Sequence, residues 1–193
     1  MSPKTNEQFA AMRRESQEKI EAAALRLFAE KGYHNTSISA IARAAGVSKG
    51  LLYNYYDGKD DLLDSLINHA IDDNSEEIEA FLQSELPPFE KIKAVTEAAV
   101  QMVVSDPSYW KLLTALALQQ DVIAHLKESL DQKKAEMIQT ATVLFEQMGY
   151  TDPEKEAFLY GATMDGLMLH YLSLGGQYPM EAMKDYIIEK YKL

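Results

Sequence analysis

A short polar and aromatic stretch near the N-terminus carries side chains that are suited to contact a nucleic acid. Ser48 and Lys49 begin this stretch, Gly50 follows, and Asn54 and Tyr55 lie near its end. An asparagine amide can form a bidentate pair with adenine, whereas hydroxyl and ammonium groups donate to phosphate oxygens. A glycine allows the backbone to approach a surface closely. These residue types predict non-covalent contacts with a duplex.

The rest of the sequence offers no pattern that is typical of an enzyme or a metal protein. The chain has no cysteine, which excludes disulfides and cysteine-bound zinc. There is no nucleophile with an adjacent base and no glycine-rich loop that would cradle a phosphate. No paired metal-ligand spacing is found around His34, His69, His125 and His170. We therefore expect no catalytic residue, no metal and no cofactor.

The elements around the polar stretch have helical spacing. Between residues 17 and 31, apolar side chains recur every three or four positions. Thr36 and Ser37 can cap a second helix, Gly46 breaks it, and Ser48 can cap a third, short helix. Two short helices joined by a tight turn that contains glycine are the pattern of a helix-turn-helix.

The sequence also predicts helices over most of the remaining chain. A long helix is expected from Lys59 to about residue 82, and prolines or glycines separate the segments that follow. We find no alternating strand pattern of useful length and no internal repeat. The sequence predicts an all-α protein of about nine helices, the later ones at 89–104, 107–118, 122–148, 153–174 and 180–191.

Charge is distributed unevenly along the chain, whose net charge is −11. Residues 1–60 contain nine lysines and arginines and seven acids, a net charge of +2, whereas residues 61–193 have a net charge of −13. Phosphate repels an acidic surface, so the first segment should face DNA. We expect a DNA-binding domain of three helices over residues 1–60 and a helical domain over 61–193. The acidic excess argues against a nucleoid-type binder that lacks sequence preference.

The ordered stretch from Thr36 to Leu63 resembles the N-terminal domain of TetR-family regulators, and the likeness covers about residues 16–66. Leu51 departs from the family pattern, which often has a threonine there, and Ala40 stands where an acid is common. The matching positions are Ile41-Ala42, Ala45-Gly46-Val47-Ser48, Gly50, Tyr53, Tyr55-Tyr56, Lys59 and Leu62-Leu63.

Residue types and the resemblance together predict the DNA contacts. Lys49, Asn54 and Leu51 are expected to read bases, the last through a thymine methyl. Ser37, Tyr55 and Lys59 are expected to contact phosphate. For Tyr53 and Tyr56, packing is favoured over base reading, and we assign Tyr56 to the core. The full expected set is Thr36, Ser37, Ser48, Lys49, Gly50, Leu51, Tyr53, Asn54, Tyr55 and Lys59.

In proteins like those of this family, the helices after the fourth form a ligand-binding and dimerisation domain, which is what the resemblance implies for residues 67–193. The segment 158–174 is apolar nearly all round, so its helix should be buried on more than one side. Together with the last helix it would form a four-helix interface in a homodimer, whose symmetry predicts a palindromic operator. The expected interface residues are Phe158, Gly161, Ala162, Gly166, His170, Met183, Tyr186 and Ile187.

A pocket for a small molecule is expected among the middle helices. Methionine and aromatic side chains adapt to varied apolar ligands, and an aspartate could anchor a polar group. The alternative is that each residue is ordinary core. The candidates are Met102, Tyr109, Trp110, Leu113, Met137, Met164, Asp165, Met168 and Tyr171.

These observations predict a ligand-responsive regulator. We expect a repressor that binds a palindromic operator as a homodimer and is released by a small apolar or amphipathic effector. The alternative is a small-molecule-binding helical protein or an enzyme that retains a helix-turn-helix module. The polar N-terminus and the short apolar stretches predict a cytoplasmic protein with no membrane partner.

Overall fold

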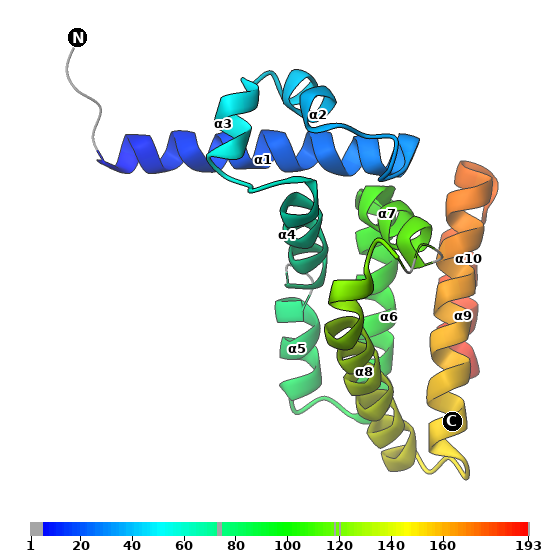
Figure 1. Cartoon of the computed structure of the whole chain (residues 1–193). Coiled ribbons are helices and arrows are strands. Elements are labelled where there is room, and N and C mark those ends of the chain that lie inside the picture. Colours follow the sequence, from blue (N-terminus) through cyan, green and yellow to red (C-terminus); the bar gives the residue numbers. More distant parts are fainter. Residues whose placement is uncertain (1–5, 73–74, 118, 120, 193) are drawn as a thin grey trace. The chain divides into compact units, whose positions relative to one another are not determined.

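The computed structural model describes residues 6–72, 75–117, 119 and 121–192, and every regular element in these ranges is helical (Figure 1). The all-α prediction is confirmed. Short 3-10 turns lie at Ala124–Leu126 and Gly175–Gln177. The α-helices are α1 (Asn6–Lys31), α2 (Ile38–Ala45), α3 (Lys49–Tyr53), α4 (Lys59–Asp72), α5 (Ser75–Gln83), α6 (Pro88–Ser105), α7 (Pro107–Ala117), α8 (Lys127–Gln147), α9 (Pro153–Leu174) and α10 (Met180–Lys190).

The described residues contain ten α-helices, where the sequence predicted about nine. The long helix expected from Lys59 to about residue 82 is present as two helices, α4 and α5. None of the described helices is both long and apolar enough to cross a membrane.

The chain divides into two compact units, Met1–Ile71 and Asp72–Leu193, which we describe separately. This division lies later than the boundary expected after residue 60. The reason is α4, which belongs by its contacts to the first unit. Its side chains Leu62, Leu63 and Leu66 are fully buried.

In the first unit, α1 packs against α2, and α2 packs against α3. Ile20, Ile41 and Leu52 have no exposed surface and supply apolar contacts from each of these three helices. Gly46 ends α2 in the left-handed conformation, with φ of 69°, as the sequence predicted for the turn. Val47 then donates its N–H to the carbonyl oxygen of Ala42 at 3.0 Å, which closes the end of α2.

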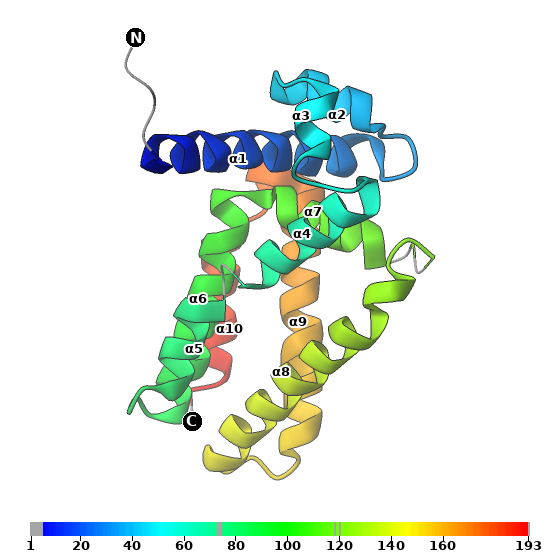
Figure 2. The same ribbon diagram turned by 60° about the vertical axis from the view of Figure 1, so that its left-hand side comes forward.

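In the second unit, α6 contacts α5, α7, α8, α9 and α10 and is therefore the central helix. Helices α8 and α9 lie side by side in opposite directions (Figures 1 and 2). An aromatic cluster fills the core near the chain end, where the ring centroids of Phe145 and Tyr191 are 5.2 Å apart. The hydroxyls of Tyr160 and Thr96 form a buried hydrogen bond of 2.7 Å.

Candidate DNA-binding site

The third helix has one buried anchor and an exposed polar edge. Leu52 is fully buried, whereas Lys49, Tyr53 and Asn54 are exposed. The side-chain oxygen of Ser48 accepts a 3.0 Å hydrogen bond from the N–H of Leu51, which confirms its predicted role as N-cap. Because the buried side holds the helix to the domain, the exposed edge is free to meet another molecule.

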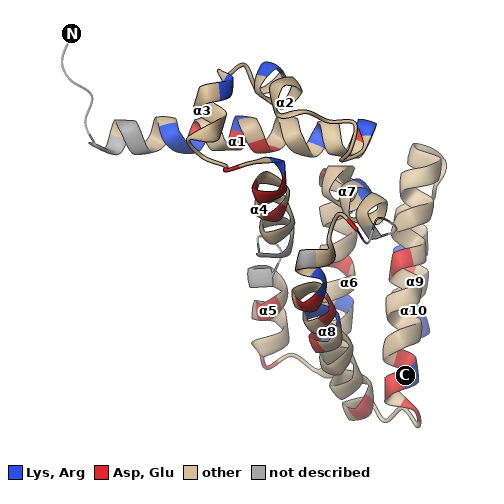
Figure 3. Cartoon of the chain, viewed as in Figure 1, with Lys and Arg blue, Asp and Glu red and all other residues tan. Residues whose placement is uncertain are grey.

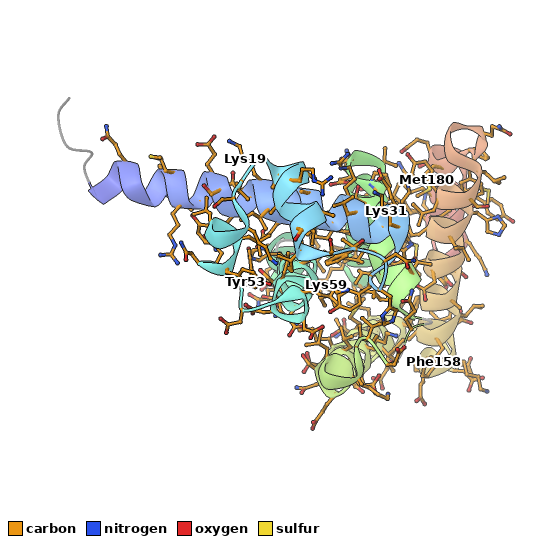
Figure 4. All side chains as sticks on the ribbon, turned by 45° about the horizontal axis from the view of Figure 1, so that its top comes forward. Lys19, Lys31, Tyr53, Lys59, Phe158 and Met180 are labelled. Carbon is orange, nitrogen blue, oxygen red and sulfur yellow. The ribbon has the colours of Figure 1, made fainter. Side chains whose placement is uncertain are left out.

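Lys49 and Tyr53 lie together on this edge, with the ammonium nitrogen 5.7 Å from the ring centroid. Figure 4 labels Tyr53 on α3. Gly50 is exposed between them, and Leu51 is half-buried beside it. Asn54 follows the last residue of α3 as its C-cap. Of the predicted base-reading residues, Lys49 and Asn54 are therefore exposed and Leu51 is half-buried.

Thr36 and Ser37, which the sequence predicted as DNA contacts, differ in exposure. Ser37 is exposed, and its hydroxyl oxygen caps α2 by accepting the N–H of Ala40 at 3.2 Å. Thr36 is only 2% exposed, and its hydroxyl lies 2.9 Å from the carbonyl oxygen of Gly32 and 3.2 Å from that of Leu27. The prediction for Thr36 needs correction, because its side chain ties the end of α1 to the connector.

Lys59, the first residue of α4, also has inward contacts (Figure 4). Its ammonium donates to the carbonyl oxygens of Tyr33 at 2.9 Å and Thr36 at 3.1 Å. The same group lies 4.1 Å from the centroid of the Tyr33 ring. These two hydrogen bonds use two of the three N–H donors of the ammonium. The sequence did not predict that Lys59 first holds α4 to the α1–α2 connector.

Two tyrosine hydroxyls donate to acids within the first unit. Tyr33 donates to Asp60 of α4, and Tyr56 donates to Glu21 of α1 at 2.5 Å. Burial raises the pKa of both phenols, and the acceptor carboxylates raise it further. Ser65 also donates to Glu21, at 2.9 Å. These acids therefore have internal hydrogen-bonding roles.

Charge on the first unit is segregated. Residues 31–56, which include α2 and α3, contain no aspartate or glutamate but carry Lys31, Arg43 and Lys49. Figure 3 shows blue on α2 and α3 and red on α4. Residues 1–71 contain nine basic and nine acidic side chains, so the net charge of this segment conceals the arrangement. Arg43, exposed on α2, was missed by the sequence analysis, and the absence of acids around it was the available signal.

The ligand candidates of the second unit do not gather into one cavity. Met168 is buried in the core, and four others pack partly buried against it: Met102, Trp110, Met164 and Tyr171. Tyr109 and Leu113 are half-buried on α7, whereas Asp165 is exposed on α9 and Met137 is 72% exposed on α8. Exposure of this degree removes Met137 from any enclosed pocket, which corrects its prediction.

Among the described residues of the second unit, we consider two hollows. One, of about 520 Å³, lies between α5, α6 and α10 and includes Met102, Phe81 and Lys184 in its lining. The other, of about 510 Å³, lies between α8 and α9 and includes Ile138 and Phe158. Met102 is the one ligand candidate that lines either hollow.

The dimer candidates lie on two different sides of their helices. Phe158, Ala162, His170 and Tyr186 are exposed, with Phe158 at 58% and Tyr186 at 69%. Three further exposed apolar residues of α9 were not predicted: Leu159, Leu169 and Leu174. Together these seven residues define the α9–α10 outer face.

Other predicted interface residues face the core of their own chain. Ile187 is 4% exposed, and Met183 packs against the same core, so both predictions need correction. Gly161 is turned toward α8, because a Cβ added there would lie 3.9 Å from Cδ1 of Ile138. Gly166 is half-buried, with open space where a Cβ would lie.

Comparisons with known proteins agree with this architecture. A family model described as "Bacterial regulatory proteins, tetR family" matches residues 20–66. The HTH-type transcriptional regulator HbdR of Aromatoleum sp. (strain CIB) is 38% identical over 78 residues, which are 40% of this chain and 34% of that protein. The fatty acid metabolism regulator protein of Bacillus subtilis is 32% identical over 98 residues, 51% of this chain and 50% of that protein. The chain thus aligns with between a third and a half of the length of these relatives.

The fold likeness extends further along the chain than these sequence matches. The transcriptional regulator FadR from Bacillus subtilis, solved in complex with stearoyl-CoA, superposes with a TM-score of 0.73 at 23% identity. The superposition covers 90% of this chain and 96% of that one. Both compact units are therefore part of a known two-unit fold. The helix-turn-helix and the family match agree, and residues 20–66 form an N-terminal domain of the kind found in bacterial regulatory proteins of the TetR family.

Proposed function

We propose that the protein represses transcription by binding a palindromic operator as a homodimer, and that a small apolar or amphipathic effector releases it. The observation that carries this proposal is the acid-free α2–α3 surface. There Lys49 and Asn54 are exposed while Leu52 anchors the helix from behind. An exposed short helix with an amide and a cation suits the major groove.

The contacts with DNA divide into two kinds. Lys49, Asn54 and the half-buried Leu51 read base edges. Phosphates are contacted from the exposed edges of both helices and from the connector that follows α3. The phosphate group consists of Ser37, Ser48, Tyr53, Tyr55 and the remaining N–H of Lys59, with Gly50 allowing close approach.

A second copy of the chain covers the α9–α10 outer face. Phe158 and Leu169 on α9 and Tyr186 on α10 are large apolar side chains that are each more than half exposed, as is typical of a surface that another chain covers. A two-fold interface buries the same patch on both subunits, and Ala162 and Gly166 allow two helices to approach closely. This dimer presents two copies of α3, as a palindromic operator requires.

The effector class follows from the relatives and from the second unit. A regulator of the same fold binds stearoyl-CoA, and a relative is named for fatty acid metabolism. In this chain, Met102, Met164 and Tyr171 are half-buried around the core. The buried indole N–H of Trp110 has no hydrogen-bond partner among the described residues and would donate to a polar atom of a ligand. We therefore propose an acyl-CoA as the effector.

The effector acts by changing the orientation of α4, which follows the DNA-binding helices in sequence and precedes the second unit. A changed orientation alters the separation of the two recognition helices, so that both half-sites cannot be met at once. Coupling free energies of this kind are typically about 1–3 kcal/mol.

The test of DNA binding uses a duplex selected from a random pool with the wild-type protein, and a random duplex of equal length. Asn54→Ala and Lys49→Ala should weaken binding to the selected duplex more than to the random one. Lys111→Ala, which removes an exposed charge from α7, serves as the control. Equal binding of the wild type to both duplexes, or none to either, would contradict the proposal.

The test of effector binding uses the only tryptophan of the chain, Trp110. Stearoyl-CoA should change its fluorescence and lower the affinity for the selected duplex, whereas coenzyme A alone should do neither. A fluorescence change without loss of DNA affinity would contradict release by this effector class.

A further inference from the structure

The N-terminal half of α1 carries a charged side chain that the helix-turn-helix contacts do not include. The guanidinium of Arg13 lies over the ring of Tyr55, with its carbon 5.3 Å from the ring centroid. Arg13 itself is exposed, and Tyr55 is half-buried. Tyr55 follows directly on Asn54, the C-cap of α3. The arginine is therefore held beside the end of the recognition helix.

The helical register of α1 fixes this position. Arg13, Gln17 and Glu21 are spaced four residues apart, so they lie on one side of the helix. Gln17 and Glu21 both interact with the Tyr56 hydroxyl, and Glu21 accepts its hydrogen bond at 2.5 Å. This side of α1 therefore faces the connector between α3 and α4. Arg13 lies on the same side, one turn closer to the N-terminus.

The charges near Arg13 leave its guanidinium available. Glu15, the nearest acid along α1, is paired with Lys19 at 2.6 Å. Within the part of the chain that the structure describes, the contact of Arg13 is the Tyr55 ring and not a carboxylate. A guanidinium held over an aromatic ring keeps N–H donors that can still bind an anion. That geometry matches the oxygens of a phosphate.

We propose that Arg13 and Tyr55 together form a phosphate clamp on the DNA backbone beside each half-site. The ring of Tyr55 orients the guanidinium, and its hydroxyl supplies a second donor to the same phosphate. This inference rests on the proposed function and adds a contact from α1, outside the 20–66 segment that matches the family. The clamp contacts no base edge, so it strengthens binding to every duplex and fixes the protein's position on it.

The main test is the salt dependence of binding for Arg13→Ala. Loss of one phosphate contact per subunit should reduce the slope of log affinity against log salt by about 0.9, or about 1.8 per dimer. Affinity for the selected and the random duplex should fall by the same factor, about tenfold at low salt. Arg13→Lys, which keeps the charge, should retain the slope. Thermal unfolding checks that each variant remains folded.

Arg26→Ala is the matched control. Arg26 is exposed on the same helix, and thirteen residues of helix turn it to a different side from Arg13. Arg26→Ala removes one positive charge, as Arg13→Ala does, but leaves the Arg13 guanidinium over the Tyr55 ring. It should therefore leave the salt slope unchanged. If both arginine variants reduce the slope equally, the effect is one of net charge and the clamp is refuted.

Two further measurements separate the clamp from its alternatives. In ethylation-interference experiments, Arg13→Ala should lose the interference at one phosphate per half-site and keep it at the others. In the Tyr55→Leu background, Arg13→Ala should have a much smaller effect, because the ring no longer orients the guanidinium. If the wild type binds DNA and Arg13→Ala has the same salt slope and footprint as the wild type, the clamp alone is overturned. Failure of the wild type to bind any duplex would overturn the proposed function instead.

Discussion

The hydroxyl of Tyr56 donates a 2.5 Å hydrogen bond to the carboxylate of Glu21, which joins the connector after α3 to the middle of α1. The same carboxylate accepts from Ser65 at 2.9 Å and lies 3.0 Å from Nδ1 of His69, both on α4. One acid thus fixes the position of α4 and of the recognition helix against α1.

We predict that Glu21→Ala destabilises the first unit, since it leaves the hydroxyls of the buried Tyr56 and the half-buried Ser65 without their acceptor. The free energy of unfolding should fall by about 1–3 kcal/mol. Urea unfolding followed by circular dichroism measures this change. Glu30→Ala, at an exposed position of the same helix, should change it by less than about 0.5 kcal/mol. Equal effects of the two substitutions would contradict the role of Glu21.

The two buried phenols of the second unit should respond in opposite ways to removal of their hydroxyls. The Tyr191 hydroxyl has no hydrogen-bond partner among the described residues, so Tyr191→Phe should leave stability unchanged or raise it. Tyr160→Phe loses the 2.7 Å bond with Thr96 and should lower stability by about 1 kcal/mol. Paired thermal melts test this, and an equal loss in both variants would contradict it.

Stability should fall at high pH. Burial raises the pKa of Tyr33, Tyr56 and Tyr191 in the folded protein above the ordinary value of 10.0, and that of Tyr191 to about 12. A raised folded-state pKa means that the stabilisation is fully present below pH 10 and is lost as pH rises through the folded value. Urea unfolding from about pH 9 to 12 should show the decline, which begins near pH 10. Tyr56→Phe should make it shallower, and an unchanged pH profile would count against this assignment.

The turn between α2 and α3 requires glycine at one of its positions. Gly46 has φ of 69°, so Gly46→Ala should destabilise the first unit by about 1–2 kcal/mol although nothing lies within 4 Å of the added Cβ. Gly58→Ala is the control, because that site is equally open and lacks a positive φ. Similar unfolding midpoints for both variants would show that backbone strain is not the cause.

Assembly should depend on the α9–α10 outer face. Phe158→Glu or Leu169→Glu places a charge on this exposed apolar surface and should convert a dimer into a monomer. Sedimentation velocity measures the state, and DNA affinity should fall with it. Lys155→Glu, an exposed charge reversal on the same helix, should leave assembly intact. A wild type that sediments as a monomer would contradict the interface.

The helix-turn-helix could be predicted because its signals are local. Ser37 and Ser48 cap the helices that directly follow them, and Gly46 supplies the positive φ of the turn between them. Each of these interactions spans only a few residues, so the order of residue types is sufficient to indicate them.

Contacts between distant residues were not predictable in the same way. Thr36 and Lys59 have types that suit phosphate, yet both donate to backbone carbonyl oxygens just after α1, Thr36 to that of Gly32 and Lys59 to that of Tyr33. Periodicity could not orient Ile187 or Met183 either, because an apolar side chain suits a core and an interface equally. The stacking of Arg13 on Tyr55 joins residues more than forty positions apart, and no pattern in the sequence indicates it.

In the first unit, the residues that hold the fold differ from those that are exposed, and this separation affects how the protein can diverge. Thr36, Lys59 and Glu21 hold the fold through inward hydrogen bonds, whereas the side chains of Lys49 and Asn54 project from the surface. Substitutions at the two exposed positions leave the internal bonds intact, and surface changes of this kind seldom alter stability by more than about 0.5 kcal/mol. Duplicated copies of the gene can therefore acquire new target sequences stepwise, each intermediate remaining a folded protein.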